Sequence, residues 1–138
     1  MKIEVVHTNN RDDPRAIGEM IPQANGTQKF DTDYNDRIYA QAVLIIVNGK
    51  RAAILRYVVG RHGTVTSHGT YVWDAYRKMG LGKMLWREAM KFTGSHVARL
   101  HCVSDRGWTL AKALERSMPN IHWEIVQDGR RRLRNLAA

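Results

Sequence analysis

The hydrophobic pattern of the chain changes at Asp74, and this change limits the possible folds more than any other feature. Before it, apolar runs at 38–47 and 52–59 flank Asn48-Gly49, which is a strong signal for a β-hairpin. Residues 64–73 are rich in β-branched and aromatic side chains and predict a third antiparallel strand. After Asp74, apolar residues recur at helical spacing: Leu81, Met84, Leu85, Ala89 and Phe92. The chain therefore predicts a mixed α/β fold.

The N-terminal part adds a strand and a helix to this frame. Residues 3–8 alternate in polarity and predict a first strand. Asp12-Asp13-Pro14 is a typical helix start, and Pro22 would stop that helix near Ile21. The polar residues 23–37 predict a loop with room for one short helix.

The C-terminal part predicts a strand, a helix and two more strands. Gly94 ends the first long helix, and Val97–Val103 follows as a buried strand. Ser104 or Asp105 can cap a second helix, which Pro119 ends and whose apolar face holds Trp108, Ala111, Leu114 and Met118. Ile121–Val126, the turn Asp128-Gly129 and Arg130–Leu136 predict a closing pair of strands. The predicted order is β-α-β-β-β-α-β-α-β-β in a single domain, 1–138.

Composition excludes several classes of protein. The single Cys102 excludes an intramolecular disulfide and a cysteine-built zinc site, and the six histidines lack metal-ligand spacing, so we expect no metal. No apolar run approaches the ~20 residues of a membrane span, and no signal segment is evident, so we expect a cytoplasmic protein without a membrane partner. Most of the four tryptophans are expected in the core, with Trp86 partly exposed.

The charge is strongly basic and unevenly distributed. The chain has 22 Lys and Arg against 13 Asp and Glu, a net charge of +9, and most of the excess lies after residue 70. Such a balance favours an anionic partner: nucleic acid, a phosphorylated cofactor or an acidic protein. Near the C-terminus, four arginines could contact nucleic acid or an acidic protein, or equally could protect an edge strand: Arg130, Arg131, Arg132 and Arg134.

The segment 72–83 combines a strand end, two glycines and a helix start. The amides at a helix N-terminus attract anions, and Gly80 and Gly82 leave the backbone accessible. Arg77, Lys78 and Lys83 add positive charge at the same place. The spacing fits neither a P-loop nor a dinucleotide fingerprint. We interpret the segment as a phosphate site; the alternative is a glycine turn that only lets a helix pack on a sheet.

At these residues the sequence resembles the GNAT acetyltransferase superfamily. The segment Arg77-Lys78-Met79-Gly80-Leu81-Gly82 is similar to its Arg/Gln-x-x-Gly-x-Gly/Ala signature, and Val72–Tyr76 is similar to the lead-in, with Asp74 in the Pro place. The resemblance implies splayed central strands and acetyl-CoA, or another short acyl-CoA, as cofactor. It implies that the amides of Lys78–Lys83 hold the pyrophosphate, and that the main chain at Val72 and Trp73 pairs with the pantetheine arm.

The resemblance is weaker in the second helix. Ala111 and Leu114 fit the family pattern, but Trp108 stands in the Asn place and Glu115 in the Tyr place. That Tyr commonly donates a proton to the leaving thiolate. Ser104 or Asp105 could serve instead, the proton could come from elsewhere or from water, or catalysis has been lost.

Acetyl transfer to an amine also needs a base, because an amine is mostly protonated near pH 7. His68, on the strand that enters the motif, is the first candidate, with a turn or solvent position as the alternative. Tyr71 is a further catalytic candidate that could equally pack in the core or line the substrate groove. Cys102 is expected to be a buried small residue rather than a nucleophile.

The expected function is therefore an N-acetyltransferase that moves an acetyl group directly to an amine on a small molecule, protein or RNA. The alternative is a catalytically degenerate GNAT-fold protein whose basic surface binds an acidic protein or nucleic acid. The missing Asn and Tyr favour this alternative, and the intact glycine turn opposes it. Homodimers are common in the resembled family, and the sequence leaves the oligomeric state open.

Overall fold

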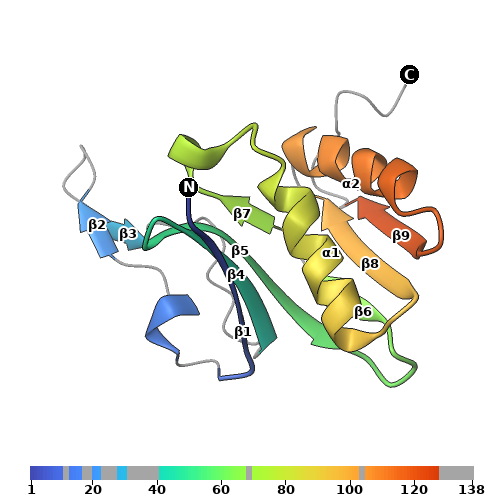
Figure 1. Cartoon of the computed structure of the whole chain (residues 1–138). Helices are drawn as coiled ribbons and strands as arrows, with labels where there is room; N and C mark the ends of the chain where they lie inside the picture. The colour runs from blue at the N-terminus through green and yellow to red at the C-terminus, as the bar shows by residue number, and fades with distance from the viewer. Residues whose placement is uncertain are drawn as a thin grey trace.

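The fold is a mixed sheet with two long helices packed on one face (Figure 1). The computed structural model describes residues 1–10, 13–16, 20–22, 28–30, 41–67, 70–102 and 105–127. The strands are β1 Ile3–Thr8, β2 Met20–Pro22, β3 Gln28–Phe30, β4 Gln41–Val47, β5 Lys50–Val59, β6 Val65–Ser67, β7 Thr70–Val72, β8 Val97–Cys102 and β9 His122–Gln127. The helices are α1 Leu81–Thr93 and α2 Asp105–Ser117, with short 3-10 turns η1 Pro14–Ala16 and η2 Asp74–Tyr76.

The antiparallel half is built around the predicted hairpin of β4 and β5. Asn48 and Gly49 both have positive φ, at 51° and 79°, as a tight two-residue hairpin turn requires. β1 pairs with β4 on the outer side. The predicted third strand, 64–73, is split into β6 and β7, and both pieces pair with β5.

The other half is parallel. β6 pairs with β8, and β8 pairs with β9, so the order across the sheet is β1-β4-β5-β6-β8-β9 with β7 beside β5. α1 connects β7 to β8, and α2 connects β8 to β9. Both helices cover the same face of the sheet, because right-handed crossovers that step in one direction across a sheet place their helices on one side (Figure 1).

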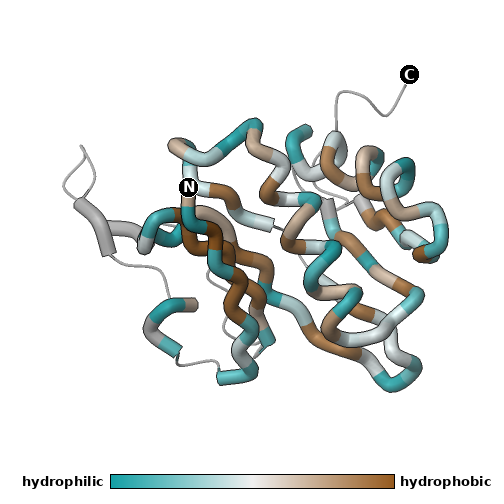
Figure 2. Tube along the Cα trace, in the orientation of Figure 1, coloured by the Kyte–Doolittle hydropathy of each residue, from teal (hydrophilic) through white to brown (hydrophobic). Residues whose placement is uncertain are grey.

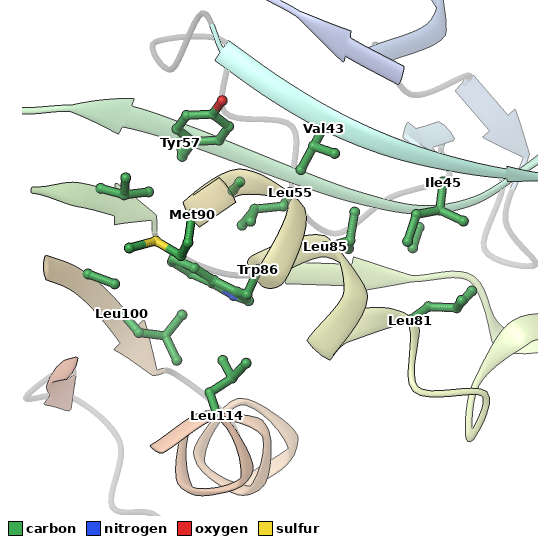
Figure 3. Close-up of a cluster of buried hydrophobic side chains, with 14 of the residues drawn as sticks. Val43, Ile45, Leu55, Tyr57, Leu81, Leu85, Trp86, Met90, Leu100 and Leu114 are labelled. Carbon is green, nitrogen blue, oxygen red and sulfur yellow. The ribbon is translucent and has the colours of Figure 1, made fainter. Parts of the chain in front are cut away.

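The main core lies between this face and the two helices (Figure 3). Leu81, Leu85, Trp86 and Met90 point from α1 toward the strands, and Leu114 comes from α2. Alternation along β4 sends Val43 and Ile45 into this core and Ala42 and Leu44 to the opposite face. Figure 2 shows the resulting apolar stretch through β4 and β5. Each large apolar side chain that is fully buried contributes ~1.5–3 kcal/mol.

The N-terminal helix prediction is wrong. Among the described residues of this segment, Pro14–Ala16 forms a turn of 3-10 helix, and Met20–Pro22 is a strand that pairs with Gln28–Phe30, within the segment predicted as a loop. Asp13 explains the short turn, because its carboxylate accepts from both the amide and the guanidinium of Arg15 and so closes a local turn. The predicted helix, from Asp12 to about Ile21, would also be only marginally stable without strong packing, because isolated short helices are.

The buried face of α1 is rotated relative to the prediction. Trp86 is fully buried rather than partly exposed, and Met90 is buried, whereas Phe92 is 62% exposed. The predicted C-terminal turn and strand, 128–136, lie outside the described residues, as do Val103 and Ser104. Neither described helix is long and apolar enough to cross a membrane.

Candidate functional site

The sheet opens between β7 and β8. The start of β5 pairs with β7, but its end pairs with β6, and only β6 continues to β8. Among the described strands, β7 has no neighbour on its outer edge. The central strands are thus splayed at the point where β7 leads into the glycine turn.

The register identifies which main-chain groups face this opening. The amide of Trp73 donates to the carbonyl of Ala52 at 2.9 Å, and the Trp73 carbonyl accepts from the amide of Tyr76 at 2.9 Å. Successive residues of a strand point their N–H and C=O groups to opposite edges, so those of Val72 face away from β5. Of the two residues predicted to pair with pantetheine, Val72 therefore offers a main-chain edge and Trp73 does not.

Trp86 fills the inner part of the opening. Its indole Nε1 donates to Oγ1 of Thr70 on β7 at 2.9 Å, and its ring meets that of Trp123 on β9 edge-on, with centroids 5.5 Å apart. Nε1 of Trp123 in turn donates to the carbonyl of Met118 at 3.2 Å. Figure 3 shows the Trp86 ring beneath α1, on the side toward Leu100 of β8. The ring thus connects β7 to the parallel strands where no strand pairing does.

The turn before α1 presents backbone amides. Lys78 and Gly80 have positive φ, at 67° and 76°, and Gly80 is the N-cap of α1 without a side chain to cap it. The first amides of an α-helix have no partner within the helix, so those of Leu81, Gly82 and Lys83 remain free for an anion. The first turn of α1 contains no acidic residue.

The cations at this turn have different surroundings. Lys78 and Lys83 are exposed. Arg77 instead braces the turn: its Nε donates to the Val72 carbonyl at 3.1 Å, and its Nη1 lies 2.6 Å from the Asp74 carboxylate. Apart from the three-residue spacing of Asp74 and Arg77, no sequence signal indicates this pairing.

The two glycines of the motif are needed for different reasons. Gly80 adopts a left-handed conformation, and a Cβ there would meet nothing within 4 Å. Gly82 has no such φ, but a Cβ there would lie 3.2 Å from a methyl group of Leu110 on α2. Gly82 therefore allows the close approach of the two helices.

Comparison with known proteins identifies the fold. No protein family model matches the sequence, and no curated relative matches it. The structure is similar to an aminoglycoside acetyltransferase from an uncultured soil metagenomic sample, solved with trehalose: the TM-score is 0.56 at 10% identity, over 82% of this chain and 87% of that one. It is also similar to a ribosomal-protein-alanine N-acetyltransferase from Brucella melitensis biovar Abortus 2308, with TM-score 0.51 at 14% identity, over 82% and 91% of the two chains.

The chain has the GNAT acetyltransferase fold. The mixed α/β sheet that the sequence predicted is thereby confirmed, and the opening between β7 and β8 gives the splayed strands that the resemblance implied. The glycine turn joins η2, which follows β7, to the start of α1.

The candidate catalytic residues are only partly described. His68 and Ser104 lie outside the described residues, so their roles stay predictions. Tyr71 is half-buried on the face opposite α1, where it packs edge-on against Trp73 with centroids 5.1 Å apart. The guanidinium of Arg51 lies 5.1 Å from the Trp73 ring and covers this aromatic pair.

In α2, Glu115 occupies the position at which the resemblance predicts a proton-donating tyrosine. Glu115 forms an ion pair with Lys112 at 2.7 Å. The same ammonium group lies 5.6 Å from the ring of Trp108. Trp108, Lys112 and Glu115 therefore form one surface cluster, in which the Lys112 ammonium balances the charge of the Glu115 carboxylate. The described residues contain no group of three or more His, Cys, Asp or Glu that could hold a metal ion.

Proposed function

We propose that this protein transfers an acetyl group from acetyl-CoA, or another short acyl-CoA, to an amine. One observation carries the proposal: the Val72 amide faces away from β5, on the strand that leads through η2 to the uncapped N-terminus of α1. A ligand with a pyrophosphate and an amide-containing arm needs these two features side by side.

The described residues fit such a ligand. Main-chain amides between Lys78 and Lys83 would hold the pyrophosphate, with the ammonium groups of the two lysines nearby. In the motif, Leu81 would contribute backbone only, because its side chain is buried in the core, whereas Met79 would contribute its amide and has an exposed side chain. Val72 would pair with the pantetheine arm, and Arg77 would keep the turn in place.

The proposed acetyl transfer requires an oxyanion donor, a base and a proton donor, and a few residues of the chain could supply them. Acetyl-CoA supplies a thioester, whose C–S bond breaks as the new C–N bond forms. The Val72 amide can donate to the carbonyl oxygen where negative charge develops. His68 would take the proton that the amine loses, and Ser104 or Asp105 would supply the proton that the departing sulfur needs, with Tyr71 as a further catalytic candidate. The acyl acceptor remains an amine of a small molecule, a protein or RNA.

Titration of acetyl-CoA by calorimetry tests the cofactor part. Lys83→Glu is the most informative variant, because an acidic residue in the first turn favours the helix while it repels phosphate. Gly82→Glu would be ambiguous, since any side chain there meets Leu110. We expect Lys83→Glu to weaken binding about tenfold or more, equivalent to ~1.4 kcal/mol.

Arg61→Glu is the matched control, with the same change in charge in the exposed turn after β5. It should bind acetyl-CoA as the wild type does. No heat of binding from a folded wild-type protein would exclude the proposal. Equal weakening by both variants would mean that only overall charge matters.

The ion pair of Glu115 with Lys112 favours a second candidate, a GNAT-fold protein that binds acyl-CoA without transferring the acyl group. Release of free thiol in the presence of a panel of amines separates the two. An acetyltransferase releases thiol in proportion to the acetylated amine. A binding protein takes up acetyl-CoA and releases none.

A further inference from the structure

One side of β1 is an open strand edge. Among the described strands, β1 ends the order across the sheet, and its only neighbour is β4. Its register with β4 runs without a bulge, and the strand contains no proline. A regular edge strand offers a row of main-chain donors and acceptors to another strand, and proteins commonly protect such edges with bulges, prolines or charged side chains. β1 therefore lacks two of these protections.

The hydrogen bonds at the start of β1 show which main-chain groups face outward. The carbonyl of Lys2 accepts from the amide of Asn48 at 2.9 Å, and the Lys2 amide donates to Oδ1 of Asn48 at 3.0 Å. The main chain of Lys2 therefore faces β4, as does that of every second residue after it. Ile3, Val5 and His7 alternate with these residues, so their N–H and C=O groups point to the open edge.

Two exposed apolar side chains lie at opposite ends of this edge, on the face that α1 covers. Ile3 is 40% exposed. Phe92, at the end of α1, is 62% exposed, although it stacks on the ring of His7 with centroids 4.2 Å apart. Alternation places the side chains of Ile3, Val5 and His7 on one face, where Val5 packs against the main core. Ile3 and His7 are separated by ~13 Å along the strand, so Ile3 does not reach Phe92 of its own chain.

We propose that β1 pairs with β1 of a second copy of this chain, antiparallel about a two-fold axis at Val5. This register places Ile3 of each copy opposite His7 of the other, where it packs beside the Phe92 ring. The pair of Val5 residues and the two pairs of Ile3 with His7 each exchange two main-chain hydrogen bonds. The two exposed apolar side chains of one copy are thus covered by the same two side chains of the other. The contact is self-complementary, as the interface of a two-fold dimer must be.

Other two-fold registers fit this edge less well. An axis at Glu4 would bring two carboxylates directly opposite each other, which is unfavourable. An axis at Val6 would place Ile3 beyond the end of β1 in the second copy and leave its side chain exposed. An axis at Ile3 or His7 would pair fewer residues of the strand. The axis at Val5 therefore gives the register that we test.

The proposed pairing leaves the candidate acyl-CoA site open. β4 and β5 lie between β1 and β7, which are three strand spacings or ~14 Å apart. The second copy extends the sheet on the side away from β7. The inference therefore does not depend on acyl transfer.

Sedimentation velocity over about 1–300 μM protein tests the dimer, because a small interface associates in about this range. About 0.3 M salt screens the repulsion between two copies of net charge +9. The wild type should change from monomer to dimer across the series. Ile3→Lys should raise the dissociation constant about tenfold or more, because it places a cation at both contacts of Ile3 with Phe92. A wild type that stays monomeric at every concentration would overturn the proposal and leave the edge to a strand of another protein.

Val58→Lys is the matched control. Val58 is 41% exposed, close to the value for Ile3, and lies at the end of β5, away from the open edge of β1. The substitution adds the same charge, so this variant should dimerise as the wild type does. An equal loss in both variants would mean that added charge alone prevents association, and would overturn the proposal.

Disulfide formation tests the register. In a Cys102→Ser background, Val5→Cys places two sulfurs at the axis, where paired Cα atoms lie ~5.5 Å apart and can be bridged. Ile3→Cys is more exposed but would hold its two sulfurs ~13 Å apart along the strands, too far for a disulfide. After oxidation, gel electrophoresis in SDS without reductant should show a covalent dimer of Val5→Cys and single chains of Ile3→Cys. The opposite pattern, or no cross-link in either variant, would overturn the proposed pairing.

Discussion

Replacement of Trp86 by Phe tests the contact that bridges the open sheet. The indole is fully buried, donates one hydrogen bond to Thr70 and packs edge-on against Trp123. Phe keeps one ring in place but loses the donor, at a cost of ~1 kcal/mol, and leaves a void that adds ~1–2 kcal/mol. We therefore expect the free energy of unfolding to fall by ~2–3 kcal/mol, or about 8–12 °C in Tm for a domain of this length.

Urea unfolding followed by far-UV circular dichroism is the appropriate assay, because the substitution removes a fluorophore. A double-mutant cycle with Thr70→Val isolates the hydrogen bond. The coupling free energy between the two positions should be ~1 kcal/mol. In the double variant, the loss of both partners leaves no polar group unsatisfied, so the second substitution should cost less than it does alone.

Trp108→Phe is the control, because Trp108 is only half-buried and its Nε1 donates to none of the described residues. It should cost less than ~1 kcal/mol. The reasoning fails if Trp86→Phe is as mild as this control, or if the cycle with Thr70 gives no coupling. Either result would mean that the Trp86 indole only occupies volume in the core and does not connect β7 to β9 through its contacts.

Three further substitutions test separate features of the fold. Gly82→Ala should change the free energy of unfolding by less than ~1 kcal/mol, measured by thermal unfolding, because the shift that its methyl group forces on Leu110 opposes the ~0.5–1 kcal/mol by which Ala favours a helix. Gly94→Ala should cost ~1 kcal/mol, because Gly94 ends α1 at a φ of 69°. Bonds from Arg15 hold the pKa of Asp13 below its usual range, so the stability from this carboxylate is complete above pH ~4 and is lost as the pH falls further. Asp13→Asn should lower Tm at pH 7 and flatten its decrease below pH 4.

Each of these has a matched comparison. Gly60→Ala places a methyl group in ordinary contact without a left-handed φ, so it should be nearly neutral. If it costs as much as Gly94→Ala, the φ argument is wrong. For the acid effect, Glu4→Gln removes a carboxylate whose ion pair with Lys2 is exposed, and should leave the acid profile unchanged. An Asp13→Asn profile that parallels the wild type would contradict the assignment.

The sequence predicted the fold best where local signals and packing agree. The hairpin at Asn48-Gly49 and the end of α1 at Gly94 follow from backbone conformations that few residues adopt, and both are confirmed. The burial of α1 was predicted less well, because Leu81, Leu85 and Ala89 fit two adjacent faces equally. Which face is buried depends on tertiary contacts of Trp86 with Thr70 of β7 and Trp123 of β9, and the hydrophobic pattern of α1 does not show these contacts.

The candidate site was likewise predictable only in part. The glycine turn at the start of α1 could be predicted from its composition. The separate reasons for Gly80 and Gly82 could not, because one depends on φ and the other on contact with a residue of α2. Nor does the sequence indicate that Arg77 is committed to the Val72 carbonyl, since any arginine near a helix start is compatible with phosphate binding.

The split of one long strand into β6 and β7 has a consequence for the order of folding. The pairings among β4, β5, β6 and β7 join strands that are close in the chain, whereas β8 reaches β6 only across α1, and β9 reaches β8 only across α2. Local pairings form sooner than distant ones, so we expect these four strands to become ordered before β8 and β9 dock. Hydrogen exchange should then be slowest in β4 and β5, with β8 and β9 exchanging together as a less protected unit. The opening beside β7 is the boundary between these two units, so a ligand bound there would slow exchange mainly in the strands that dock last.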